Sequence, residues 1–144
     1  MPQNTVFLTH TDTTIGFISQ NAKKLDMIKK RPPNKHYIIA VDSFMTLKNF
    51  ARVPNNFKHR VRRAKKTTFI MPNGHSYRVI KNSQHLKLLA KLKWAYTSSA
   101  NLSHHPYDEN YARKMADVTI EPLNKPSSAS TIYKIGHRKI KKVR

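Results

Sequence analysis

The chain has 144 residues, a length that fits one domain. It contains no cysteine, which excludes disulfide bonds, thiol catalysis and zinc sites built from cysteine. No apolar run approaches the roughly 20 residues that a membrane span needs, and residues 1–5 lack the basic start and apolar stretch of a signal peptide. We therefore expect a cytoplasmic domain without a membrane partner.

Charge is the unusual feature of the composition. Lysine and arginine number 28 against 7 aspartates and glutamates, which gives a formal net charge of +21. Such a chain attracts polyanions through long-range Coulomb forces and counterion release, and nucleic acids and nucleotide phosphates are the obvious candidates. The basic clusters at residues 58–66 and 139–144 predict salt-sensitive binding to structured RNA. The alternative is a compositional bias without a specific partner.

The first half of the chain predicts short strands that alternate with helices. Residues 5–8 indicate a buried strand, and a polar turn over residues 9–14 follows it. Ser19 is placed to cap a helix over residues 21–30, which Pro32 ends. Further along, the sequence predicts a strand over residues 36–41, a helix that begins at residue 42 or 43, and a basic helical stretch over residues 55–66.

The second half contains the clearest local signal, a hairpin. Residues 67–71 and 76–80 are rich in β-forming side chains, and the Asn73-Gly74 pair between them favours the positive φ angles of a tight turn. Ser83 is placed to cap a helix with leucines at helical spacing. Further strands are predicted over residues 94–98, 118–120 and 130–135, a helix over 107–116, loops over 101–106 and 122–129, and a basic tail over 137–144. This order implies an α/β fold with a mixed parallel and antiparallel sheet.

Common catalytic signatures are absent from the sequence. The chain has three glycines, too few and too scattered for a P-loop or a dinucleotide fingerprint. Its carboxylates are scattered, apart from Asp108-Glu109 at an expected helix start, so a paired-carboxylate hydrolase is not predicted. The histidines form no pair at helical spacing, and we expect no metal site.

Three polar clusters stand beside predicted strands. Residues 11–17 combine hydroxyls with a glycine, which suits either a small polar ligand or a capped turn. Lys29 and Arg31 lie two residues apart at a helix end, where they can converge on a polyphosphate or simply complement the helix dipole. Residues 97–103 carry a row of hydroxyl and amide groups directly after an apolar strand. Such a row is typical either of a ligand-binding edge of the sheet or of an ordinary turn.

Taken in order, these clusters resemble the motifs of the YrdC/TsaC family of threonylcarbamoyl-AMP synthase-like proteins. The matching runs are Thr-Asp-Thr-x-x-Gly at residues 11–16, Lys-x-Arg-Pro at 29–32, Thr-Ser-Ser-Ala-Asn-Leu-Ser at 97–103, and Ala-Ser-Thr-Ile at 129–132. Residues 68–72 and 77–79 are similar to two further strands of that family. The resemblance covers roughly residues 6–133 and implies a short, N-terminally truncated member, with a YrdC-like domain over residues 1–136 and a basic tail over 137–144.

The resemblance also implies a fold and a reaction. The fold would be a twisted mixed sheet with flanking helices and a concave cleft. The reaction joins L-threonine, bicarbonate and ATP into L-threonylcarbamoyladenylate and pyrophosphate, for the N6-threonylcarbamoyladenosine modification of tRNA, with tRNA and downstream threonylcarbamoyl-transfer proteins as partners. Mg²⁺ would be bound mainly through the phosphates of ATP, because carboxylates are scarce. Catalysis would consist of positioning and charge stabilisation, and no residue is assigned as nucleophile or base.

The family's functional residues fall on matching positions of this chain. The implied ATP-binding residues are Lys29, Arg31, Ser99 and Asn101, and the implied threonine-binding residues are Thr11, Arg78, Thr97 and Ser130, with Thr68 nearby. Two alternatives remain open. One is a non-catalytic module of this fold that binds double-stranded RNA or tRNA, and the other is an enzyme of the family that acts on a different small acid.

Overall fold

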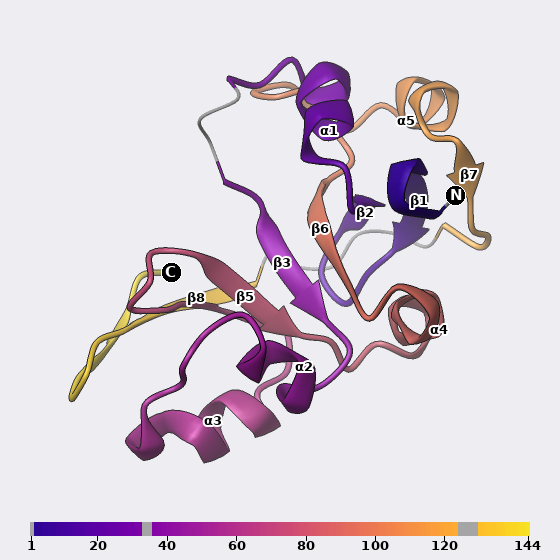
Figure 1. The fold of residues 1–144 in the computed structure, drawn as a ribbon. Coiled ribbons are helices and arrows are strands. Elements are labelled where there is room, and N and C mark those ends of the chain that lie inside the picture. The colour runs from indigo at the N-terminus through magenta and orange to yellow at the C-terminus, as the bar shows by residue number, and fades with distance from the viewer. Residues whose placement is uncertain (1, 33–35, 124–129) are drawn as a thin grey trace.

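Nine strands form one mixed sheet in the computed structural model, which describes residues 2–32, 36–123 and 130–144 (Figure 1). The order across the sheet is β7-β1-β2-β6-β3-β5-β4-β8-β9. The strands are β1 (Phe7–His10), β2 (Ile15–Ser19), β3 (Ile38–Val41), β4 (Thr67–Ile70), β5 (Ser76–Val79), β6 (Trp94–Ser99), β7 (Val118–Thr119), β8 (Thr131–Ile135) and β9 (Ile140–Lys142). Three pairs are parallel, namely β1 with β7, β3 with β5, and β4 with β8. The other pairs are antiparallel, so the mixed α/β sheet predicted from the sequence is confirmed.

Five α-helices flank the sheet within the described residues. They are α1 (Ala22–Lys29), α2 (Phe44–Lys48), α3 (Lys58–Arg63), α4 (Ser83–Leu92) and α5 (Glu109–Met115), and two 3-10 turns cover Pro2–Asn4 and Asn55–Phe57. Ser43, one of the two residues at which the second helix was predicted to begin, caps α2, and Asp108, at the expected start of a helix, caps α5. Two other caps are corrected: Asn21 rather than Ser19 caps α1, and Asn82 rather than Ser83 caps α4. None of these helices is long and apolar enough to cross a membrane.

The helices cover opposite faces of the sheet. Along β3, Ile39 and Val41 pack into a core beneath α2 and α3, whereas Ala40 packs beneath the leucines of α4. This alternation follows from the two-residue period of a strand. A third core joins β1 and β2 to α1 and α5. The face that carries Ala40 is the one on which the candidate site lies.

Strand β2 is the main element that the sequence did not predict. Its residues 15–19, expected to lie between a turn and a helix, instead pair with β1 on one side and β6 on the other, and all five are buried. Gly16 allows this close pairing, because a Cβ there would stand 3.0 Å from the Ser98 carbonyl oxygen. Ser19 ends this strand, and its hydroxyl accepts a hydrogen bond from the Asn21 N–H at 3.0 Å.

The hairpin and the C-terminal segment complete the other half of the sheet. Strands β4 and β5 are antiparallel as predicted, and Gly74 in their turn has a φ of 86°. The predicted loop over residues 122–129 lies partly outside the described residues. Residues 137–144, expected to form a tail, contain β9, which pairs with β8, and Arg144 exchanges backbone hydrogen bonds with Ile132. The expected boundary after residue 136 therefore falls inside a hairpin rather than between a domain and a tail.

Candidate functional site

The candidate site is centred on Arg78 in β5. Its neighbours Tyr77 and Val79 enter the core beneath α2 and α3. Because side chains alternate along a strand, the Arg78 side chain emerges on the opposite face, that of its parallel partner Ala40. Only 6% of Arg78 is exposed, so its guanidinium group needs polar partners from the protein.

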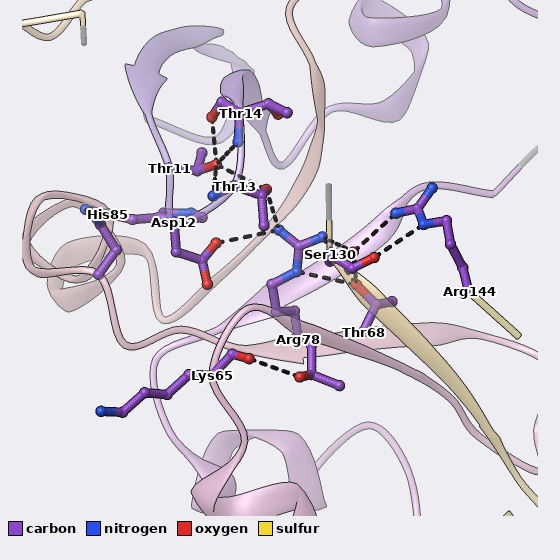
Figure 2. Close-up of polar contacts among 12 residues, drawn as sticks. Thr11, Asp12, Thr13, Thr14, Lys65, Thr68, Arg78, His85, Ser130 and Arg144 are labelled. Carbon is purple, nitrogen blue, oxygen red and sulfur yellow. Dashed lines mark hydrogen bonds and ion pairs between the residues drawn. The ribbon is translucent and has the colours of Figure 1, made fainter. Parts of the chain in front are cut away.

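Four side chains from three other segments provide these partners (Figure 2). Arg78 Nε and Nη2 donate to Thr68 Oγ1 of β4 at 3.2 and 3.0 Å, and Nη2 also donates to Ser130 Oγ at 3.0 Å. Arg78 Nη1 donates to Thr13 Oγ1 at 3.1 Å and forms an ion pair with Asp12 Oδ1 at 3.4 Å. The Thr68 and Ser130 hydroxyl oxygens lie 3.0 Å apart. The fold thus joins the first and last predicted motifs around one cation.

A second guanidinium group reaches the same cluster from the end of the chain. Arg144 Nη2 donates to Ser130 Oγ at 3.2 Å, and its Nε donates to the Ser130 carbonyl oxygen at 3.0 Å. Burial lowers the pKa of Arg78, the Asp12 carboxylate acts in the opposite direction, and the charge of Arg144 lowers this pKa further. A guanidinium group does not lose its proton in proteins near neutral pH, so Arg78 is a cation.

A cavity of about 370 Å³ lies beside this cluster. Three arginines line it, namely Arg31, Arg78 and Arg144, together with hydroxyl groups from residues 97–99 of β6 and from Ser130. Arg31 comes from the segment after α1, where its guanidinium lies 4.6 Å from the centre of the Tyr37 ring and donates to the His36 carbonyl oxygen at 3.1 Å. Cationic groups and hydroxyls around a cavity are suited to an anionic ligand that carries further polar groups.

The first motif contributes different residues from those expected. The Thr11 hydroxyl is used within its own turn, where it accepts from the N–H groups of Thr13 and Thr14 at 3.2 and 3.1 Å and donates to the Thr14 carbonyl oxygen at 2.5 Å. Thr11 is buried and does not line the cavity. Asp12 and Thr13, which the sequence did not single out, are the residues that contact Arg78. Their place inside the Thr-Asp-Thr-x-x-Gly run was a signal that the sequence offered. The direction in which each side chain of the turn points could not be predicted from the sequence.

Lys29 and Asn101 hold a loop behind the cavity wall. Lys29 Nζ donates to the carbonyl oxygens of Ser99 and Asn101 at 2.7 and 2.9 Å and to Asn101 Oδ1 at 3.1 Å. The same Oδ1 accepts from Ser99 Oγ at 2.5 Å, and Asn101 Nδ2 donates to the carbonyl oxygens of Leu102 and His105 at 3.1 and 2.8 Å. Burial, with a smaller effect of Arg31, lowers the pKa of Lys29 to about 8.

The predicted site residues therefore divide into two groups. Five of them line the cavity, namely Arg31, Arg78, Thr97, Ser99 and Ser130. The others, Thr11, Lys29, Thr68 and Asn101, do not line it but hold the turn, the loop or the Arg78 guanidinium in place. Arg144 was missed because the sequence placed it in a tail, and only the pairing of β9 with β8 brings it to Ser130. Within the described residues, no group of three or more histidines and carboxylates could hold a metal ion.

Comparisons with known proteins bear on this fold. No protein-family model matches the chain. Uncharacterized protein MG259 of Mycoplasma genitalium is 35% identical over 134 residues, which cover 86% of this chain and 28% of that protein. The uncharacterized MG259 homolog of Mycoplasma pneumoniae is 29% identical over 141 residues, or 90% of this chain and 30% of that protein. This chain thus spans about three tenths of the length of these curated relatives.

Solved structures show the same architecture. P. abyssi Sua5 complexed with L-threonine superposes with a TM-score of 0.80 at 19% identity, over 97% of this chain and 50% of that one. E. coli YciO gives a TM-score of 0.78 at 15% identity, over 98% of this chain and 82% of that one. T. kodakarensis HypF gives 0.76 at 17% identity, over 99% of this chain and 23% of that one. The chain therefore has the Sua5/YrdC-like fold that its motifs predicted.

Proposed function

We propose that this chain forms L-threonylcarbamoyladenylate from L-threonine, bicarbonate and ATP. The observation that carries the proposal is the buried guanidinium of Arg78, which is surrounded by hydroxyls beside a cavity that Arg31 and Arg144 also line. The fold is shared with a Sua5 structure complexed with L-threonine, which supports the same type of ligand here. The cavity volume of about 370 Å³ is at the lower end of typical small-molecule sites.

In this proposal the amino acid binds next to Arg78. A carboxylate can accept two parallel hydrogen bonds from a guanidinium. Arg78 would redirect toward the threonine carboxylate some of the N–H groups that now donate to Thr68 and Ser130. The hydroxyls of Thr97 and Ser130 line the same cavity and can bind the threonine hydroxyl and amine. Thr11 acts indirectly, because its hydroxyl fixes the turn that presents Thr13.

The nucleotide would lie toward Arg31 and Arg144. Both arginines line the cavity, and each can bind a phosphate through two N–H groups. Ser99 lines the cavity as well, whereas Lys29 and Asn101 contribute by fixing the loop that follows it. The phosphates of ATP would carry Mg²⁺, since the described residues include no cluster of carboxylates and histidines for it.

The chemistry then needs positioning and charge rather than a protein nucleophile. The threonine amine attacks bicarbonate to give a carbamate and water, and a carbamate oxygen attacks the α-phosphorus of ATP. The bond from the α-phosphorus to the bridging oxygen breaks, and pyrophosphate leaves with the electron pair. Arg31 and Arg144 can stabilise the negative charge that spreads over the phosphates in this transition state, while Arg78 holds the threonine carboxylate.

The test is direct detection of the product by mass spectrometry. The protein is incubated with ATP, L-threonine and bicarbonate, and each substrate is omitted in turn. We expect a mass of threonylcarbamoyladenylate only in the complete mixture, and we expect Arg31→Gln to reduce its yield more than tenfold. Lys23→Gln, at an exposed position of α1, is the matched control and should keep the yield of the unaltered protein.

The two alternative functions predict different results in this assay. A non-catalytic module that binds RNA would release no pyrophosphate with any mixture of these substrates. An enzyme for another small acid would release pyrophosphate from ATP only when threonine is replaced by that acid. Absence of the threonine adduct in the complete mixture, with the fold intact by circular dichroism, overturns the proposal.

A further inference from the structure

A continuous arc of five aromatic side chains lies on the sheet face opposite the candidate site. The ring centres lie 6.3 Å apart between Tyr37 and Tyr96, 5.2 Å between Tyr96 and Trp94, 5.5 Å between Trp94 and Phe50, and 6.2 Å between Phe50 and Tyr77. The rings are tilted or edge-to-face, which is the arrangement that aromatic pairs prefer at these distances. The arc is therefore one packed unit.

The strand register builds the floor beneath this arc. Strands β6, β3 and β5 lie side by side in the middle of the sheet (Figure 1). Ile39 of β3 pairs with Tyr96 of β6 on one side and with Tyr77 of β5 on the other, so these three side chains stand in a row on one face. Ile39 and Tyr77 are buried, whereas Tyr96 and Phe50 are half-buried, so part of each of these two rings faces outward.

A cavity of about 480 Å³ lies against this row, within the range of small-molecule sites. We call it the aromatic pocket, and the lining residues that matter here are Tyr37, Ile39, Phe50, His75, Tyr77 and Tyr96. The turn of the β4–β5 hairpin supplies one wall, where the His75 ring packs edge-to-face on the ring of His36 at 4.7 Å between centres.

Polar groups are placed among the rings of the pocket. The Tyr77 hydroxyl accepts a hydrogen bond from Asn73 Nδ2 at 3.0 Å, and it keeps its own proton to donate. The Tyr96 hydroxyl has no hydrogen-bond partner among the described residues. Hydroxyl and imidazole groups can each donate or accept, so the pocket combines ring faces with adaptable hydrogen-bonding groups.

We propose that the aromatic pocket binds the base of a purine nucleoside. A purine is planar, so its faces can stack on the half-buried rings while its nitrogen-bearing edge pairs with the hydroxyl and imidazole groups. A purely apolar ligand would leave these polar groups unpaired. A cation is less suited, because the Arg31 guanidinium already lies 4.6 Å from the centre of the Tyr37 ring and the chain carries a net charge of +21.

This pocket is distinct from the Arg78 cavity. Tyr77 and Arg78 are consecutive residues of β5, so their side chains lie on opposite faces of the sheet. The two cavities share His36 and Tyr37, at the start of β3, but their floors are separated by the sheet itself. The nucleoside is therefore a second molecule and not the ATP proposed for the Arg78 cavity. The inference does not depend on the proposed reaction.

The test uses the single tryptophan of the chain as a reporter. Trp94 lies 5.2 Å from Tyr96 between ring centres, so a base stacked in the pocket should quench its fluorescence. The protein is titrated with adenosine, cytidine and ribose. We expect saturable quenching by adenosine with a dissociation constant on the order of 0.1 mM, as for a ligand of this size. Cytidine should bind about threefold more weakly or worse, because its smaller ring stacks less, and ribose should cause no saturable change.

Two variants assign the signal to the aromatic pocket. Tyr96→Leu removes a ring but keeps an apolar side chain, and it should weaken adenosine binding about tenfold or more. Its matched control is Tyr133→Leu, which removes an equally half-buried ring from β8 outside the pocket and should leave binding unchanged. His75→Ala alters a turn residue that the core does not need. Trp94 and Tyr96 also line a neighbouring cavity, whereas His75 does not, so weaker binding in His75→Ala places adenosine in this pocket.

Arg144→Gln separates this inference from the proposed function, because Arg144 lines the Arg78 cavity and not the aromatic pocket. This variant should bind ATP more weakly and adenosine with unchanged affinity. The proposal is overturned if adenosine causes no saturable quenching, if cytidine binds as tightly, or if Tyr133→Leu loses as much affinity as Tyr96→Leu. Adenosine binding that is lost in Arg144→Gln but kept in His75→Ala also overturns it, since the nucleoside would then occupy the Arg78 cavity.

Discussion

Asn101→Ala should destabilise the protein substantially. The family resemblance implied that Asn101 binds ATP, but its side chain makes four hydrogen bonds within the protein, three of them in its own loop and one with Lys29 of α1. Each is worth about 0.5–1.5 kcal/mol net, so their loss in a partly exposed loop costs about 3 kcal/mol of unfolding free energy. For 144 residues the unfolding entropy is about 0.3 kcal/mol/K, and the melting temperature should therefore fall by about 10 °C.

The assay is a thermal melt followed by circular dichroism, with and without ATP. Asn49→Ala is the matched control, because Asn49 is exposed at the end of α2, and its melting temperature should stay within about 2 °C of the unaltered protein. If Asn101 acts mainly through the loop, ATP should still raise the melting temperature of the folded variant. An unchanged melting temperature together with lost ATP protection would refute this reasoning and would show that the amide binds the nucleotide directly.

Three further predictions follow from single residues. His85 is fully buried, and burial lowers its pKa to about 3, so as the pH falls the unfolded chain takes up a proton on His85 before the folded protein does. The contribution of His85 to the free energy of unfolding is therefore complete above pH 6.5, and about 2 kcal/mol of it should be lost by pH 5. Urea unfolding measures this loss, which should be absent in His85→Leu. Gly16→Ala should cost about 1–3 kcal/mol in the same assay, because its Cβ would meet a backbone carbonyl oxygen at 3.0 Å, whereas Gly136→Ala, with an ordinary 3.5 Å approach, should cost little. Arg31→Ala should weaken ATP binding in calorimetry about tenfold or more and leave the melting temperature unchanged, because Arg31 lines the cavity. Lys29→Ala should also weaken ATP binding, but it should lower the melting temperature as well, because Lys29 holds the loop after β6.

Local chemistry explains which elements the sequence could predict. The β4–β5 hairpin was predicted because an Asn-Gly pair between two β-rich runs is a short-range signal, and the leucines of α4 were predicted because helical spacing needs only neighbouring residues. Strand β2 was missed because its five buried residues contain a glycine and show no alternation, a pattern that only pairing on both sides explains. Strand β9 was missed because its lysines look like a solvated tail until β8 is placed beside them.

The candidate site was predictable as a set of segments but not as a set of contacts. Arg78 and Ser130 were named from their motifs, and the fold brings them within 3.0 Å across 52 residues of sequence. The exchange of Thr11 for Asp12 and Thr13 as contact residues could not be predicted, because successive residues of a turn point in directions that depend on its backbone angles. The role of Asn101 was equally hidden, since a cleft-facing amide and a loop-forming amide have the same sequence context.

The charge of the cavity favours a ligand, or a pair of ligands, with more than one anionic group. Arg78 is buried with hydroxyl partners and one carboxylate, and its 3.4 Å separation from Asp12 is longer than the roughly 2.7–2.9 Å of a strong charge-assisted hydrogen bond. Arg31 and Arg144 add two further cations to the same walls, so like charges repel across a partly desolvated space. A single negative charge beside Arg78 relieves only part of this repulsion, because Arg144, which shares the Ser130 hydroxyl with Arg78, and Arg31 carry two further positive charges. A small carboxylate together with a polyphosphate can neutralise all three, and this charge balance is the physical reason for proposing threonine and ATP as a pair of ligands.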